Sequence, residues 1–298
     1  MPNYIRFDWA MKRMLRDKAN HAVLEGLLTS LIGERFRIER FLESESNRRD
    51  EDDKFNRVDI LAENDRGELV IIEIQNSHEL AYFHRMLYGV SKAITDYIAL
   101  GSDYSKVKKV YSVNIVYFSL GQGNDYVYHG KTIFRGLHDK DDVLMLSRRQ
   151  QEVFFGSTCN PSGKSREAGD IFPEYYVLKV NNFDQVARTP LDEWIEFLKT
   201  GEIDANASAP GLSEARTCLD YDRLPIDERR AYVRHMENLS YQSSVLGTSF
   251  DDGEQKGIII GRHEEKREIA RNLLALNTPI STITSATGLS EEEIKMLK

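Results

Sequence analysis

The sequence has few of the residues that mark an exported or membrane-spanning chain. It holds two cysteines, Cys159 and Cys218, outside any Cys-x-x-Cys spacing, which excludes a disulfide framework and a zinc cluster. No run comes near the roughly 18 consecutive apolar residues of a membrane span. The first residues, MPNYIRFDWAMKRML, interrupt their apolar positions with charges. We therefore expect neither export nor membrane spanning, and a cytoplasmic protein.

Proline is also scarce, and the composition is that of a folded globular protein. The 298 residues include 7 prolines, with 41% hydrophobic and 30% charged side chains, which argues against wholesale disorder. The net charge of -8 is not typical of a nucleic-acid-binding protein, although phosphate contacts require only local lysine and arginine. Residues 1–20 carry five basic and two acidic side chains, which form either a phosphate-binding patch or a solvated helix face.

The length and the order of the segments indicate one main domain with a C-terminal appendage. Periodicity predicts helices over residues 7–16, 20–32, 78–100 and 189–201, and strands over 36–42, 57–63, 68–76, 110–120, 126–137 and 172–180. A polar stretch at 160–170 is expected to be a mobile loop, and 203–211 a linker. We predict an α/β or α+β domain over residues 1–200, a helical linker region over 201–252, and C-terminal helices over 253–298.

The helix predicted over residues 78–100 connects two strands. Its apolar residues recur three or four positions apart: Leu80, Phe83, Leu87, Val90, Ile94 and Ile98. We expect this stripe to face the sheet and Gly101 to end the helix. The next segment, VYSVNIVYFSL, is expected to form a buried strand parallel to the one before the helix, because a helical crossover joins parallel neighbours.

Two carboxylates stand in the middle of the apolar strands at 57–63 and 68–76. Asp59 and Glu73 occupy positions where an ionised side chain is costly unless something compensates its charge. The intervening NDRG is typical of a hairpin turn, since Asn, Asp and Gly tolerate a left-handed backbone. With the turn centred near Arg66, paired positions sum to 132, so Asp59 faces Glu73 with Cβ atoms roughly 5 Å apart.

A divalent cation between these carboxylates removes both the repulsion and the burial cost. Hard oxygen ligands are those that Mg²⁺ or Mn²⁺ prefers, and the backbone carbonyl of Ile74 is a further ligand candidate. Gln75 lies on the same strand face as Glu73, where its amide can orient a water or a phosphate oxygen. The alternative is structural: Asp59 and Glu73 form ordinary salt bridges with Arg57 or Arg85.

This arrangement resembles a known superfamily. An Asp, a hairpin, Glu-x-Gln, and a following helix with Arg85 and Tyr88 resemble the PD-(D/E)XK nucleases. Within that superfamily, FDWAMKRML, RVDILAENDRGELVIIEIQN, FHRMLYG, LDEWIEFL and TGLSEEEI resemble the Rpn-type recombination-promoting nucleases and related transposases. The resemblance covers most of the chain. It implies a restriction-endonuclease-like fold with a central mixed sheet flanked by helices.

The resemblance also implies which residues act. Asp59 and Glu73 would bind Mg²⁺ or Mn²⁺, and Gln75 stands where the superfamily usually has a lysine. A neutral amide can position the attacking water but cannot offset developing charge. That second task is left to Lys12, Arg85 or a second metal ion.

Further positions match the family more weakly. Asp8 and Lys12 match its N-terminal motif and lie one helical turn apart. Arg85 and Tyr88 would contact DNA phosphates, and Glu25 corresponds to the first-helix acid of many members. Each has an ordinary alternative: a surface ion pair, helix–sheet packing, or a solvated side chain.

The C-terminal residues NTPISTITSATGLSEEEIKML resemble a helix-turn-helix, with Ser290 as N-cap and Glu293 completing a capping box. The second helix opens with Glu291, Glu292 and Glu293, which would direct negative charge at DNA phosphates. We therefore favour a packing role, or homo-oligomerisation through these helices, over base recognition.

Two functions remain open from the sequence. The first is a divalent-metal-dependent DNA endonuclease, a hydrolase of phosphodiester bonds that promotes recombination or transposition. The second is a catalytically silent DNA-binding or protein-interaction module that keeps the nuclease fold. The presence of Asp59, Glu73 and Gln75 favours the first, because a silent descendant has no need of two buried carboxylates opposite each other.

Overall fold

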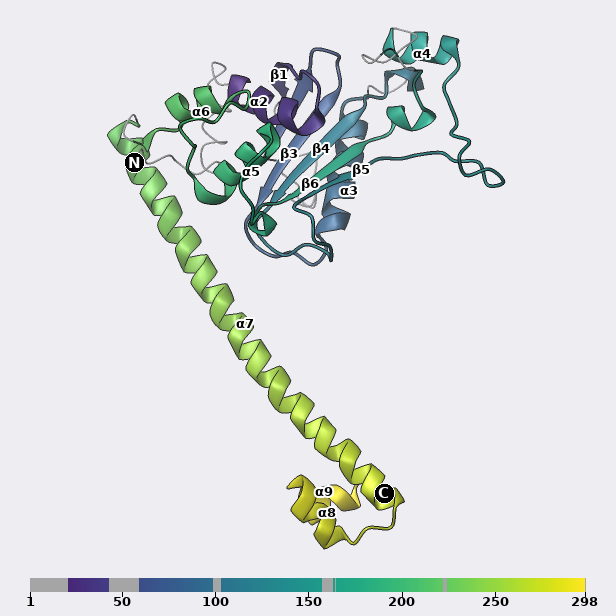
Figure 1. Ribbon diagram of the computed structural model, residues 1–298, viewed down its shortest axis with the longest axis vertical. Helices are drawn as coiled ribbons and strands as arrows, with labels where there is room; N and C mark the ends of the chain where they lie inside the picture. The colour runs from purple at the N-terminus through teal and green to yellow at the C-terminus, as the bar shows by residue number, and fades with distance from the viewer. Residues whose placement is uncertain are drawn as a thin grey trace. The chain divides into compact units, whose positions relative to one another are not determined.

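The computed structural model describes residues 21–42, 59–98, 103–156, 163, 165–221 and 224–297. Its centre is a six-stranded sheet in the order β1-β2-β3-β4-β6-β5 (Figure 1). The strands are β1 (Ile38–Leu42), β2 (Ile60–Asn64), β3 (Leu69–Gln75), β4 (Val110–Val116), β5 (Val127–Gly130) and β6 (Glu174–Lys179). β3, β4 and β6 run parallel, and the outer pairings are antiparallel. The predicted α/β class with a mixed sheet is confirmed; the helix predicted over 7–16 lies outside the described residues.

β2 and β3 form the predicted hairpin. The N–H of Gly67 donates to the C=O of Asn64 at 2.9 Å, and Gly67 has φ of 75°, in the left-handed region that favours glycine. The strands pair from Glu63↔Leu69 to Ile60↔Ile72, so every pair sums to 132 as predicted. This register places Asp59, the residue before β2, at the level of Glu73.

Helix α3 (Tyr82–Asp96) connects β3 to β4 and covers one face of the sheet (Figure 1). β4 is buried along its whole length and parallel to β3, as its apolar sequence predicted. Between helix and sheet lies a core cluster of Leu61, Leu69, Ile71, Val90, Ala93 and Val110. The odd-numbered residues of β3, which include Glu73 and Gln75, therefore face α3.

The apolar stripe predicted for α3 contacts the sheet only in the second half of the helix, at Val90 and Ile94. Leu80, Phe83 and Leu87 are 92%, 53% and 58% exposed, whereas the buried residues of α3 are Tyr82, Met86, Gly89, Val90 and Ala93. The prediction counted only apolar side chains. The sheet beneath the start of α3 presents polar groups, so a tyrosine with a hydroxyl packs there in place of a leucine.

Helices α2 (His21–Ile32), α5 (Pro190–Thr200) and α6 (Leu212–Cys218) lie on the side of the sheet away from α3 (Figure 1). α5 follows its sequence signals: Thr189 forms a capping box with Asp192, Pro190 begins the helix, and Gly201 ends it in the left-handed conformation. The fully buried Trp194 donates its indole N–H to the C=O of Pro210 at 3.1 Å.

Residues 203–211 were predicted to be a linker and are instead packed onto the domain. Ile203 and Ala209 are buried, and the Glu193 carboxylate accepts from the backbone N–H of Ala209. A Cβ on Gly26 would lie 2.1 Å from the carbonyl oxygen of Pro210, so the backbone of α2 contacts this segment directly. Small residues, which resemble a linker in sequence, serve here to permit a close approach.

The strand predicted over 126–137 ends early, because β5 stops at Gly130. Beyond it, isolated bridges join Arg135 to Val143 and Met145 to Glu167, and α4 (Arg148–Phe155) follows. The loop predicted at 160–170 lies partly outside the described residues, and Ala168–Ile171 forms a short 3-10 helix.

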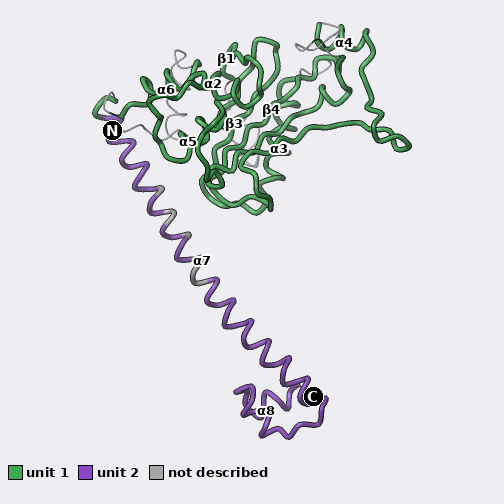
Figure 2. Tube along the Cα trace, in the orientation of Figure 1, with its two compact units in different colours: residues 1–226 green, residues 227–298 purple. Residues whose placement is uncertain are grey.

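The chain divides into two compact units, residues 1–226 and 227–298 (Figure 2). The boundary predicted at 252/253 falls inside one continuous helix, α7 (Ile226–Ala275). The second unit ends in α8 (Ile280–Thr287) and α9 (Glu291–Lys295), which enclose Ala270, Ile283, Leu289 and Ile294. The predicted capping box of Ser290 and Glu293 is present. In the described part of the chain, no helix is long and apolar enough to cross a membrane.

Candidate active site

Asp59 is held by the strand that it faces. Its Oδ2 accepts a hydrogen bond from the backbone N–H of Ile74 at 2.7 Å. The N–H and C=O of one residue point toward the same edge of a strand, so the carbonyl of Ile74 faces the edge at which Asp59 lies. The carboxylate and the carbonyl that the sequence suggested as ligands therefore lie together, where β2 begins and β3 ends.

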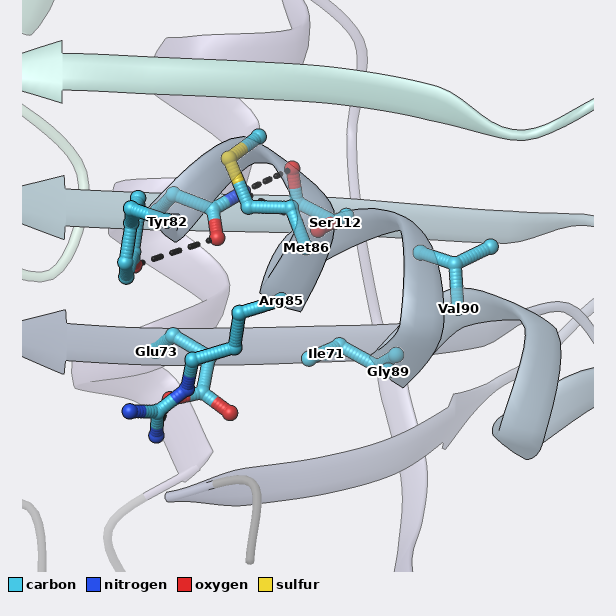
Figure 3. Close-up of a pocket in the computed structure, with 9 residues that line it drawn as sticks. Ile71, Glu73, Tyr82, Arg85, Met86, Gly89, Val90 and Ser112 are labelled. Carbon is cyan, nitrogen blue, oxygen red and sulfur yellow. Dashed lines mark hydrogen bonds and ion pairs between the residues drawn. The ribbon is translucent and has the colours of Figure 1, made fainter. Parts of the chain in front are cut away.

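Glu73 is a buried carboxylate with incomplete charge compensation. It is 7% exposed, and its Oε2 lies 3.3 Å from Nη2 of Arg85 (Figure 3). Burial, and secondly the Asp59 carboxylate, raise the pKa of Glu73 to about 8 against the opposing effect of Arg85. Arg85 alone therefore does not offset the effect of burial and of Asp59 on the pKa of Glu73.

Arg85 is shared between two carboxylates. Its Nη1 lies 3.2 Å from Oε2 of Glu79, while Nη2 contacts Glu73. Its Nε is buried without a hydrogen-bond partner among the described residues. The sequence placed Arg85 on the helix flank away from the core, and the structure places it on the flank that borders β3, with its guanidinium directed at Glu73 (Figure 3).

A buried polar network lies beside Glu73 and Arg85. The hydroxyl of Tyr82 donates to Oδ1 of Asn114 at 3.3 Å, and Nδ2 of Asn114 donates to Oγ of Ser112 at 3.0 Å. These side chains, with Glu73 and Arg85, line a small cavity of about 10 Å³ (Figure 3). That is room for about one water molecule among polar groups. The network keeps Tyr82 oriented beside Glu73 at the end of the strand.

Gln75 has a specific partner that the sequence did not suggest. Its amide nitrogen donates to the backbone carbonyl and to Oγ of Ser77, at 3.2 and 3.0 Å. These bonds fix the orientation of the amide and tie the end of β3 to the loop that leads into α3. Gln75 still shares the strand face of Glu73, as its spacing predicted.

Of the weaker candidates, Tyr88 and Glu25 lie on different helices. Tyr88 is exposed on α3, one turn beyond Arg85. Glu25 accepts a hydrogen bond from the N–H of Ile38, which pairs with Asn64 at the turn end of the hairpin, away from Asp59. Glu25 therefore has a structural role in holding β1. Asp8 and Lys12 lie outside the described residues.

Sequence reasoning missed Glu79, Tyr82 and Asn114. Asn114 carried a signal, because a polar residue in the middle of the otherwise apolar VYSVNIV strand requires a buried partner. Glu79 carried none, since it sits in a polar segment between strand and helix and becomes significant only through its contact with Arg85.

The donor set fits a hard divalent cation. Mg²⁺ is usually bound by one or two carboxylates and keeps several waters, and Asp59, Glu73 and the carbonyl of Ile74 would supply such a set. No group of three or more His, Cys, Asp or Glu side chains with metal-binding geometry occurs among the residues that the structure describes. The raised pKa of Glu73 supports the fit, because a cation beside it would stabilise the ionised form.

Comparison with known families agrees with this geometry. Residues 5–142 match the family described as PD-(D/E)XK nuclease family transposase. Residues 263–298 match the family described as Rpn/YhgA-like nuclease family, C-terminal HTH domain. Searches of the curated proteins and of the solved structures gave no match. The fold and the two matches support the resemblance to the Rpn-type branch of the PD-(D/E)XK superfamily, whose members have a restriction-endonuclease-like core.

The C-terminal unit has a helix-turn-helix arrangement with an unusual charge. α9 is short and begins with three glutamates. Glu293 caps the helix and pairs with His263 of α7, whose Nε2 lies 3.3 Å from its Oε1. Glu291 and Glu292 are exposed. The N-terminus of α9, the part that reads bases in many such motifs, thus presents negative charge.

Proposed function

We propose that this protein is a divalent-metal-dependent DNA endonuclease that hydrolyses phosphodiester bonds at Asp59, Glu73 and Gln75. The observation that carries the proposal is the buried Glu73 carboxylate beside Asp59, with a pKa raised to about 8. A Mg²⁺ or Mn²⁺ ion held there would polarise the scissile phosphate and lower the pKa of an attacking water. Breaks of this kind would serve recombination or transposition.

The remaining tasks fall to residues of this chain. The hydrogen bonds to Ser77 hold the amide of Gln75, so that its oxygen orients the attacking water. Gln75 carries no charge, and Arg85 supplies the positive charge that offsets the developing charge on the phosphate. Tyr88, on the same flank of α3 as Arg85, contacts the DNA backbone.

A second candidate is a silent module that binds DNA or protein with the same fold. The ion pair of Arg85 with Glu73 favours it, because a structural salt bridge needs no metal. The position of Asp59 opposes it. A carboxylate that raises the pKa of a buried neighbour is a cost to folding that a purely structural site would not keep.

Plasmid cleavage distinguishes the two candidates. We expect nicking or cutting with Mg²⁺ or Mn²⁺, no cleavage in EDTA, and a loss of about 10²- to 10³-fold in Asp59→Asn and Glu73→Gln. Glu63→Gln is the matched control, because Glu63 lies on the same strand face but pairs with Arg40 and Lys108. Its cleavage rate should stay within twofold of the wild type. Equal rates in all four proteins would eliminate the site assignment.

For the C-terminal unit, we propose packing or self-association of the chain. The glutamates of α9 support this, because they would repel DNA phosphates at the position that a recognition helix occupies. Light scattering of the full chain, compared with Glu291→Lys and Glu292→Lys variants, tests it. If the wild type is monomeric, self-association is excluded. If the lysine variants bind a DNA duplex more tightly than the wild type does, the repulsion between α9 and DNA is supported.

A further inference from the structure

We propose that Glu79 is a positioning residue of this site, which holds the Arg85 guanidinium where it can bind a DNA phosphate. This inference rests on the proposed function and assigns a role to a carboxylate outside the Asp59–Glu73 pair. It starts from the two ion pairs of Arg85, with Glu73 at 3.3 Å and with Glu79 at 3.2 Å, each through a different terminal nitrogen.

The guanidinium of Arg85 is divided between two carboxylates. An arginine beside a single carboxylate favours a bidentate pair, in which two nitrogens contact the same group. Here Nη2 alone contacts Glu73, because Nη1 is taken by Glu79. Without Glu79, we expect Arg85 to close onto Glu73 and occupy the position of a cation.

Glu79 lies where it can hold Arg85 toward the DNA. Its side chain is 36% exposed, whereas that of Glu73 is 10% exposed. The guanidinium thus spans from the buried carboxylate to the rim of the site. When Glu73 binds a cation, the contact with Glu79 keeps Arg85 at the rim, with Nη2 available to a phosphate.

The loop that carries Glu79 is itself fixed. The amide of Gln75 holds Ser77, and the C=O of Glu79 accepts from the N–H of Tyr82 at the start of α3. Glu79 is therefore tied on one side to the end of β3 and on the other to the helix that bears Arg85. A second role of Gln75 follows, because its amide orders the segment that presents Glu79.

A double-mutant cycle tests the proposal. The proteins are the wild type, Glu79→Gln, Arg85→Gln and the double variant. Two quantities are measured for each: the Mn²⁺ affinity by calorimetry without DNA, and the affinity for a short DNA duplex by fluorescence anisotropy in EDTA. We expect Glu79→Gln to weaken both about fivefold, and to have less than a twofold effect when Arg85 is already glutamine.

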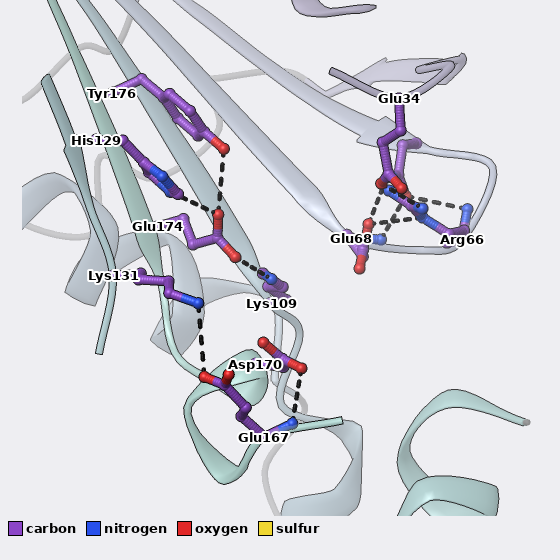
Figure 4. A network of polar contacts seen from close by, with 11 residues as sticks. Glu34, Arg66, Glu68, Lys109, His129, Lys131, Glu167, Asp170, Glu174 and Tyr176 are labelled. Carbon is purple, nitrogen blue, oxygen red and sulfur yellow. Dashed lines mark hydrogen bonds and ion pairs between the residues drawn. The ribbon is translucent and has the colours of Figure 1, made fainter. Parts of the chain in front are cut away.

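The chain offers a matched control at the other end of the hairpin. Arg66 also lies between two carboxylates, Glu34 at 2.7 Å and Glu68 at 2.9 Å (Figure 4). Glu34 is about as exposed as Glu79, with a side-chain exposure of 34%. Glu34→Gln should therefore leave both affinities unchanged. Thermal melting of each variant checks that the fold is intact.

Three results overturn the proposal. An effect of Glu79→Gln that persists in the Arg85→Gln background would show that Glu79 acts directly. If Glu79→Gln keeps the wild-type affinities for Mn²⁺ and DNA while the wild type cleaves DNA, the role proposed for Glu79 is refuted and the proposed function stands. A wild type that binds neither Mn²⁺ nor DNA would refute this inference together with the proposed function.

Discussion

Two carboxylates at opposite ends of the parallel strands, the partly buried Glu174 and the buried Glu73, have opposite electrostatic environments. Glu174, at the start of β6, lies 2.6 Å from Nζ of Lys109 and 2.9 Å from Nε2 of His129, and accepts from the hydroxyl of Tyr176 (Figure 4). Burial alone would raise the pKa of Glu174, but Lys109 and His129 hold it below the ordinary value. This carboxylate is fully compensated within the protein.

Glu73, near the end of β3, has neighbours whose charges act in the opposite direction on its pKa. Its neighbours are a second carboxylate, Asp59, and an arginine that it shares with Glu79. Its pKa is therefore raised where that of Glu174 is lowered. The difference shows that burial alone does not decide the direction of a carboxylate's pKa shift, and that the charges beside the carboxylate do.

The largest expected effect is on the pH dependence of stability. The folded-state pKa of Glu73 is about 8, and its unfolded value is about 4.3, so between these values the folded protein binds more protons. In EDTA, the free energy of unfolding should fall by about 3 kcal/mol as the pH rises from 5 to 8. Urea titrations measure this fall, and Mg²⁺ should remove most of it.

Glu73→Gln provides the control for that titration. Glutamine has no charge to bury, so the variant should lack the decline between pH 5 and 8. Glu174 contributes with the opposite sign: its lowered pKa stabilises the fold above about pH 4.3, and this stabilisation is lost on acidification. The same slope in the wild type and in Glu73→Gln would contradict the comparison.

Substitution of Glu174 should lower the free energy of unfolding without slowing DNA cleavage. Glu174→Gln leaves Lys109 and His129 without their charged partner, and we expect a loss of about 2 kcal/mol in the free energy of unfolding at pH 7. Cleavage per folded molecule should be unchanged. Glu73→Gln should show the reverse, with retained stability and lost cleavage.

The smallest expected effect concerns Gln75. Gln75→Ala removes both the amide oxygen and the hydrogen bonds to Ser77, and we expect cleavage to slow about tenfold. Ser77→Ala removes one of those hydrogen bonds but leaves Gln75 in place, so its rate should stay within threefold of the wild type. Equal losses in the two variants would assign Gln75 to loop ordering alone.

Local sequence signals predicted the hairpin well. The NDRG turn, the alternation of the strands and the sum of 132 depend on residues close together in the chain, and the observed pairs follow them. The caps of α5 and α9 were predicted for the same reason. Each of these features is decided by hydrogen bonds within a few residues, which are the same in any tertiary setting.

The rotation of α3 was not predictable from its own residues. An apolar stripe of Leu80, Phe83 and Leu87 competes with a second face of Tyr82 and Met86, and the sheet selects the second. The packing of residues 203–211 likewise depends on α2, more than 170 positions earlier in the chain. Neither partner can be identified from the local pattern.

The sequence by itself determined that two carboxylates face each other across a hairpin, because strand register is a local property. Only the tertiary structure decided what surrounds them. The rotation of α3 directs Arg85 at Glu73, and the loop after β3 places Glu79 on the other side of the guanidinium. Charge compensation acts through space rather than along the chain. The balance that distinguishes Glu73 from Glu174 therefore exists only in the folded protein.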